Sequence, residues 1–244
     1  VGGSATSDGG IGALQALGLT FSGIPTPAAG KDLIDITEIN DQAPHWLEKI
    51  NFQIACDVNN LFTGVQGSAK TYGLQKCSST IDSIVVIEQI EKGMLHLKKL
   101  ILNKRNIDLD RVPGSGAAGG IAGSMHALLN AKLNPGIQII FDAIQLTEKI
   151  NQADLIITGE GRLDQQTFHG KVVSGIINEA QRRNKPVWAL CGQNTLNSLE
   201  IKKLGLKKVY TLIENAPLIE CLQNTPSVVK KTIQFLKRDL SQLN

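Results

Sequence analysis

The sequence predicts an α/β fold with two α/β domains, in which the carboxyl-terminal part is a parallel sheet with helices on both faces. Apolar runs and helically spaced segments alternate as β-α-β-α-β in the last third of the chain. Glycines follow the first two of these apolar runs. A chain of 244 residues is long enough to bury one large core or two smaller ones. Runs that are apolar throughout are typical of strands covered on both faces.

The carboxyl-terminal elements follow one another in a regular order. Strands are expected over 154–158, 186–191 and 208–213, and helices near 171–183 and 226–241. Right-handed βαβ connections make neighbouring strands parallel. Ligands bind at the carboxyl ends of such strands. We therefore expect a Rossmann-like or flavodoxin-like domain over residues 121–244.

The first half of the chain predicts a smaller α/β domain with glycine-rich loops over residues 1–120, with its α/β unit around 25–110. The segment "NFQIACDV" (51–58) is apolar enough for a strand. Residues 79–106 have the spacing of one long helix, capped by Ser79 or Thr80. Before these elements, "VGGSATSDGG" opens the chain, and its glycines allow backbone amides to approach an anion closely.

The composition excludes several classes of protein. With 42% hydrophobic and 19% charged residues the chain is not disordered, and a net charge of +3 is too small to indicate nucleic-acid binding. A secretory signal and an apolar stretch of about 20 residues are both missing, so no membrane partner is expected. Cysteines stand far apart without a CxxC pair, which favours small buried side chains in a cytoplasmic protein; they are Cys56, Cys77, Cys191 and Cys221.

A glycine-rich segment, "PGSGAAGGIAG" (113–123), precedes a predicted helix. Its Gly114, Gly116 and Gly119 have G-x-G-x-x-G spacing, and such a loop offers free amides and a positive helix end to a phosphate. A dinucleotide site also needs an apolar strand just before the loop and an acid about 20 residues after it. Both are missing here. A phosphate-binding loop of another kind is therefore favoured over an NAD(P)-dependent 2-hydroxy-acid dehydrogenase.

A second dense cluster, "ITGEGRLDQQTFHGK" (157–171), follows a predicted strand directly. Acidic, basic and hydroxyl side chains occur together in it, at the place where an α/β fold keeps its active-site loop. Beside a glycine-rich loop, they form the set of groups that phosphoryl transfer uses. The structural alternative is a charged surface loop capped by Thr167.

Five ordered motifs together resemble the glycerate kinase family, whose members phosphorylate D-glycerate with ATP; they are "GGSATSDGG", "ACDVNN", "GVQGSAKTYGLQK", "PGSGAAGG" and "ITGEGRLDQQTFHGK". The resemblance covers nearly the whole chain. It implies two α/β domains with the active site in the cleft between them, ATP and Mg²⁺ as cofactors, and 2-phosphoglycerate as the favoured product, with homo-oligomerisation left open. The family's N-terminal region has no counterpart here, so we expect a truncated chain with part of the active site.

Site residues follow from the resemblance position by position. It implies a substrate or phosphate loop of Ser4, Thr6 and Asp8, with Asp57 at a strand end facing the cleft. The implied phosphate-binding backbone is formed by Gly114, Ser115, Gly116, Gly119 and Gly120.

The implied reacting centre contains Glu160, Asp164 and Lys171. Asp164 is the candidate to orient or deprotonate the glycerate hydroxyl, and Glu160 or Asp57 would hold Mg²⁺. The γ-phosphate or the glycerate carboxylate would be bound by Lys76, Arg162 or Lys171. Arginine's planar fork suits a carboxylate better than an ammonium does.

Three hypotheses stay open from the sequence: a glycerate kinase, a dehydrogenase, and a non-catalytic fragment that binds ligand. The kinase hypothesis predicts that residues 2–10, 114–120 and 159–171 converge on one cleft, because phosphoryl donor and acceptor must share one space.

Overall fold

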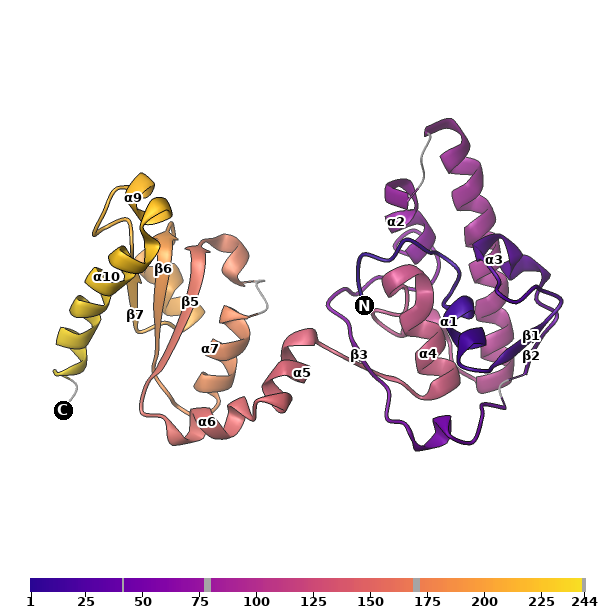
Figure 1. Ribbon diagram of the computed structural model, residues 1–244, viewed down its shortest axis with the longest axis horizontal. Coiled ribbons are helices and arrows are strands. Elements are labelled where there is room, and N and C mark those ends of the chain that lie inside the picture. Colours follow the sequence, from indigo (N-terminus) through magenta and orange to yellow (C-terminus); the bar gives the residue numbers. More distant parts are fainter. Residues whose placement is uncertain (41, 77–79, 169–171, 243–244) are drawn as a thin grey trace. The chain divides into compact units, whose positions relative to one another are not determined.

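A computed structural model describes residues 1–40, 42–76, 80–168 and 172–242, and it divides the chain into two compact units, Val1–Ile139 and Ile140–Asn244 (Figure 1). The division falls later than the boundary expected after residue 120. Helix α4 (Ile121–Leu129) packs against α1 (Ile11–Ala16) and α3 (Thr80–Arg105). Strand β4 (Lys132–Asn134) pairs with β3 (Gln53–Ala55). These contacts assign α4 and β4 to the first unit.

The first unit combines short strands with helices. Strands β1 (Thr20–Ser22) and β2 (Glu38–Asn40) pair antiparallel, whereas β3 and β4 pair parallel. The expected strand at 51–58 is thus present in a shortened form, and the expected long helix is α3. The remaining elements are α2 (Ser68–Lys76) and the 3₁₀ helices η1 (Gly30–Asp35), η2 (Leu47–Lys49), η3 (Leu109–Arg111) and η4 (Ala117–Gly120).

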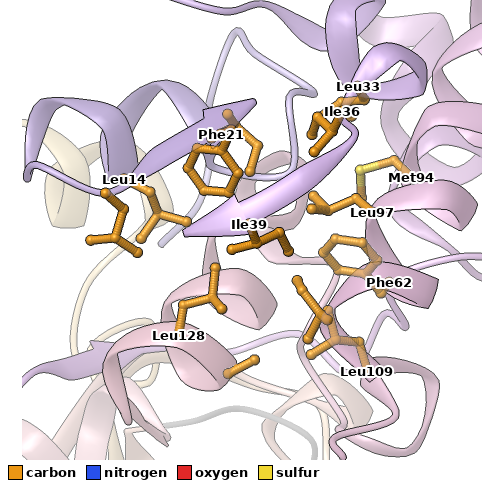
Figure 2. Packing of buried hydrophobic residues seen from close by; sticks show 14 of the residues in the cluster. Leu14, Phe21, Leu33, Ile36, Ile39, Phe62, Met94, Leu97, Leu109 and Leu128 are labelled. Carbon is orange, nitrogen blue, oxygen red and sulfur yellow. The ribbon is translucent and has the colours of Figure 1, made fainter. Parts of the chain in front are cut away.

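One apolar core holds the first unit together (Figure 2). Met94, Leu97 and Ile101 on α3 are fully buried and recur at helical spacing, so they form one stripe on that helix. Phe62 and Leu33, both also fully buried, pack in the same cluster. Figure 2 shows Met94 and Leu97 of α3, Leu33 of η1 and Phe62 of the loop that follows β3 pointing toward one another. The core therefore holds the loop that precedes α2, through Phe62.

The second unit is built on a three-stranded parallel sheet in the order β5-β6-β7, as predicted. Alternate residues of β6 enter two different cores. Ala189 and Cys191 pack with α7, and Leu190 packs against the cluster that contains Val228 of α10. Helices therefore cover both faces of the sheet. The elements are β5 (Ile156–Leu163), β6 (Val187–Asn194), β7 (Lys208–Thr211), α6 (Leu146–Gln152), α7 (Val173–Gln181), α8 (Ser198–Leu204), α9 (Leu218–Gln223) and α10 (Thr225–Leu240).

Strand β5 is longer than the sequence predicted. Its pairing with β6 continues to Arg162, opposite Gln193, and to Leu163, opposite Asn194. Glu160 and Arg162 therefore lie in a strand, not in the loop expected after residue 158. Backbone pairing needs no apolar side chains, and β5 is at one end of the strand order, where polar residues are tolerated. Helix α5 (Gly136–Ala143) spans the division between the two units.

No helix within the described ranges is both long and apolar enough to cross a membrane.

Candidate active site

The carboxylate of Asp8 fixes the start of α1. Its Oδ1 accepts a hydrogen bond from the Gly10 amide at 3.0 Å, and its Oδ2 accepts one from the Gly12 amide at 3.0 Å. The side chain is buried, so these bonds replace its contact with water. Asp8 thereby anchors the segment Ser4–Ser7, which precedes it.

Lys76, the last residue of α2, reaches across to this segment. Its ammonium donates hydrogen bonds to Ser4 Oγ at 3.2 Å, to the Thr6 carbonyl at 2.5 Å and to Ser7 Oγ at 3.2 Å. Burial lowers the pKa of Lys76 from its ordinary value, and the negative charge of Asp8 partly opposes that shift. The sequence joins these positions only through a resemblance, whereas the fold brings them into direct contact.

A pocket of about 330 Å³ opens beside Lys76. Tyr72, Gln75 and Lys76 lie at i, i+3 and i+4 on α2, so they present one face of the helix to it. The Tyr72 hydroxyl donates to Asn60 Oδ1 at 2.5 Å. Sequence reasoning missed Tyr72 and Gln75, although their spacing to Lys76 could have identified them. The pocket is lined by Val1, Gly2, Gly3, Ser4, Val58, Tyr72, Gln75, Lys76, Ala118 and Gly119.

The expected approach of segments 2–10 and 114–120 is present. The Gly9 amide donates to the Gly119 carbonyl at 2.9 Å, and a Cβ on Gly119 would come within 2.2 Å of the Thr6 carbonyl oxygen. Ala118, Gly119 and Gly120 are all left-handed, with φ of 53°, 76° and 97°. Two of these positions are glycine, the residue that adopts this conformation most readily.

Other residues of the 114–120 loop serve its packing. Ser115 is fully buried, and its hydroxyl donates to the Leu109 carbonyl at 2.7 Å, so its side chain holds the loop from within. A Cβ on Gly116 would lie 2.0 Å from the Leu61 carbonyl oxygen, and one on Gly114 would lie 2.7 Å from Cys56 Sγ. These glycines are needed for close approach of the backbone. Of the loop, Ala118 and Gly119 line the pocket.

Asp57 stands two residues beyond β3 and contacts the start of α5. Its Oδ1 accepts a hydrogen bond from the Gly136 amide at 3.0 Å. A carboxylate at this position satisfies an amide at the first turn of a helix and interacts favourably with the helix dipole. The structure therefore gives Asp57 a structural partner in addition to the metal or substrate role implied for it.

The second unit holds the other candidate residues, around Thr167. This side chain is 2% exposed, and its hydroxyl donates to Glu160 Oε2 at 3.0 Å while accepting from the Asp164 amide at 3.2 Å. Asp164 Oδ1 accepts from the Gln166 amide at 2.8 Å, at the start of η5 (Gln165–Phe168). Arg162 Nε lies 3.4 Å from Asp164 Oδ2.

Thr167 and Arg162 therefore link Glu160 and Asp164, and two carboxylates and a guanidinium are grouped at the carboxyl end of β5. Thr167 bonds to the Asp164 amide as a cap would, but Glu160 and Arg162 lie in a strand and not in the surface loop of the structural alternative. Lys171 lies outside the described residues. The segments 2–10 and 114–120 belong to the first unit and 159–171 to the second, so the convergence of all three stays a prediction.

Cys191 lies opposite Glu160 in the sheet. Burial, together with the negative charges of Glu214 and Glu160, raises the pKa of its thiol to about 12. The thiol is protonated at neutral pH and packs in the core, as predicted. Cys221 is also buried and Cys56 is half-buried, while Cys77 is outside the described residues.

The described residues contain no group of three or more His, Cys, Asp or Glu side chains that could hold a metal ion. Mg²⁺ at a phosphoryl-transfer site usually needs only one or two protein carboxylates, because the phosphates and water fill the other positions. Glu160, an exposed carboxylate at the end of β5, fits that smaller requirement.

Comparison with known proteins supports one family. The model of the "Glycerate kinase family" matches residues 1–241. A glycerate kinase of Halalkalibacterium halodurans is 32% identical over 236 residues, which cover 95% of this chain and 61% of that protein. A glycerate 2-kinase of Escherichia coli is 35% identical over 221 residues, which cover 87% of this chain and 56% of that protein.

The fold comparison agrees. A crystal structure from Salmonella typhimurium LT2, of a protein assigned as glycerate kinase 2, matches with a TM-score of 0.78 and 34% identity, covering 99% of this chain and 63% of that one. The chain thus spans about three fifths of the length of the relatives it matches. None of these matches supports the dehydrogenase alternative.

Proposed function

Because the chain belongs to the glycerate kinase family, we propose that it takes part in the ATP-dependent phosphorylation of D-glycerate, with 2-phosphoglycerate as the product. The observation that carries this proposal is the pocket of the first unit, where the Ser4–Ser7 segment, Lys76 and the backbone at Gly119 meet. A pocket that combines an ammonium, hydroxyls and glycine backbone is suited to an anion. Use of ATP places the proposed reaction in the cytoplasm.

The first unit would bind the charged parts of the substrates. Ser4 and Thr6 belong to the segment that Lys76 contacts, and Gly119 lines the same pocket. Hydroxyls and amides donate to carboxylate and phosphate oxygens alike, so either anion fits this wall of the pocket.

The second unit would supply the groups that act on the reacting atoms. The oxygen of the glycerate hydroxyl forms a bond to the γ-phosphorus, the bond from that phosphorus to the ADP oxygen breaks, and Asp164 accepts the hydroxyl proton. Arg162 lies in β5, two positions before Asp164, and would bind a carboxylate or phosphate oxygen. Glu160 would hold Mg²⁺, which neutralises charge on the phosphates when bound.

A coupled assay tests the proposal. We expect formation of ADP when the protein is given MgATP and D-glycerate, and no oxidation of NAD(P)H with 2-oxo acids. Binding of D-glycerate or ATP without turnover would instead support a ligand-binding role for this chain. If the chain shows no turnover, the same assay is repeated on a protein of the relatives' full length. Turnover by the longer protein would mean that this chain lacks part of the active site, whereas no turnover would mean that the proposed substrate is wrong.

A further inference from the structure

We propose that Lys76 is a positioning residue: its ammonium holds the Ser4–Ser7 segment so that the hydroxyl hydrogen of Ser7 is free to donate to an anionic oxygen of the substrate, whereas the Ser4 hydroxyl donates to the Thr6 carbonyl within the segment. The identity of that substrate rests on the proposed function. The placement of the segment does not.

The number of its hydrogens limits what the Lys76 ammonium can bind. An alkyl ammonium has three hydrogens to donate. Lys76 has three acceptors within hydrogen-bond distance, and all three belong to the same short segment: Ser4 Oγ, the Thr6 carbonyl and Ser7 Oγ. A direct bond to a substrate would require the ammonium to give up one of them. Lys76 is therefore placed to shape the segment and not to bind the substrate itself.

The direction of its bond with Lys76 leaves the Ser7 hydroxyl hydrogen free. A serine hydroxyl has one hydrogen to donate and two lone pairs to accept. By accepting from Lys76, Ser7 Oγ uses a lone pair and keeps its hydrogen, and within the described residues its side chain has no other hydrogen bond. A hydroxyl that accepts from a cation is polarised, which makes its own O–H a stronger donor. Ser7 was not among the residues expected from the sequence.

The backbone of the Ser4–Ser7 segment is held on two sides. A Cβ on Gly30 would come within 2.5 Å of the Ser7 carbonyl oxygen, and one on Gly119 within 3.0 Å of Ser7 Cα. These glycines leave room for the backbone but do not set the direction of its side chains. Lys76 supplies that direction from the third side, and the lowered pKa of this half-buried lysine agrees with a position partly shielded from water.

Hydrogen exchange tests the placement without any substrate. We expect Lys76→Met to accelerate exchange in a peptide spanning residues 2–12 by about 10-fold or more, the factor that corresponds to losing hydrogen bonds from a charged donor. Lys76→Arg should restore part of the protection. Lys70→Met is the matched control, because Lys70 is an exposed lysine on the same helix. Exchange in α10 should not change in any variant.

Unchanged exchange of residues 2–12 in Lys76→Met, or equal acceleration in Lys70→Met, would overturn the proposal. If the first unit of the Lys76→Met variant does not fold, the same exchange experiment is carried out on Lys76→Gln, whose side chain keeps a polar end.

Kinetics test the consequence for the substrate. If Lys76 acts through Ser7, the double variant Lys76→Met/Ser7→Ala should lose no more kcat/KM than the worse single variant, whereas independent roles would give multiplied losses. The substrate whose KM rises, D-glycerate or ATP, identifies whether a carboxylate or a phosphate oxygen is bound. If the unmodified protein phosphorylates no glycerate, the proposed function fails, while the exchange experiment still decides the role of Lys76.

Discussion

Asp164 combines a structural contact with the position proposed for a base. Its Oδ1 caps η5 through the Gln166 amide, and asparagine can keep that bond. The ion pair with Arg162 is partly exposed, so its loss changes stability little. We expect Asp164→Asn, in the catalytically competent protein, to lower kcat by about 100-fold or more, because a group that activates a hydroxyl typically contributes about 10²–10⁴-fold.

Steady-state kinetics and a thermal melt check this expectation together. The melting temperature and the KM for ATP should stay close to those of the unmodified protein. A kcat within about threefold of the original would remove Asp164 from the mechanism and leave it as a helix cap.

Asp110 gives the first unit a pH-dependent contribution to stability. Burial alone would raise the pKa of Asp110, but hydrogen bonds from Lys98 and Thr63 outweigh it and hold the pKa below its usual value. The ionised form therefore stabilises the fold above the ordinary carboxyl pKa near 3.9, and this contribution is lost as the pH falls through the lowered folded-state value.

Urea unfolding at several pH values measures this effect. At pH 7, Asp110→Asn should lower the free energy of unfolding by roughly 1.5–3 kcal/mol, the range for hydrogen bonds to charged groups. The difference from the unmodified protein should shrink as the pH falls below the ordinary carboxyl pKa, because protonation of Asp110 then removes the ionised form that the fold stabilises. Asp35→Asn, at an exposed position of the same unit, is the control. A difference that does not vary with pH would contradict the assignment.

For single residues, the sequence predicted the candidates but not their contacts. Motifs identified Asp8, Lys76 and Asp164 as candidate site residues, but they did not identify the residues to which these side chains bond. Lys76 and Ser7 are 69 positions apart, and only the packing of α2 beside the first segment brings them into contact. Helical spacing, by contrast, already links Tyr72 and Gln75 to Lys76.

At the scale of elements, the 114–120 loop depends on the absence of side chains. A Cβ on Gly119 would collide with the Thr6 carbonyl, and the residue has a φ of 76°. Gly119→Ala should destabilise the first unit by about 2 kcal/mol or more, from the strain of a left-handed residue and from overpacking. Gly2→Ala is the control, because nothing lies within 4 Å of its added Cβ. Equal melting temperatures for the two variants would refute this account.

The elements themselves were predictable where their pattern is long and regular. The periodicity of 79–106 identified α3, and the alternation in the last third identified three parallel strands and the helices α7 and α10. Strands β1, β2 and β4 are three residues each, too short for a period to be recognised. The extension of β5 through Gly159–Leu163 depends on pairing with β6, which a local pattern does not contain.

At the scale of the whole molecule, the two units have separate cores. Leu97 is fully buried in the core of the first, and Ile177 is fully buried in that of the second. We expect each of Leu97→Ala and Ile177→Ala to remove about 2–5 kcal/mol. In calorimetry each should shift one of two transitions and leave the other in place. Parallel shifts of both transitions would show that the units unfold as one.

The bond between the Gly9 amide and the Gly119 carbonyl also sets an order of events during synthesis. The two partners are 110 positions apart, so the first segment leaves the ribosome long before its partner exists. At roughly 5–20 residues per second, that interval is about 5–20 seconds. Ile11 and Leu14, fully buried in the finished unit, share a core with Ala127 and Leu128, so that core is completed only after this interval. The strands of the second unit, by contrast, all lie between Ile156 and Thr211 and find their partners soon after they emerge.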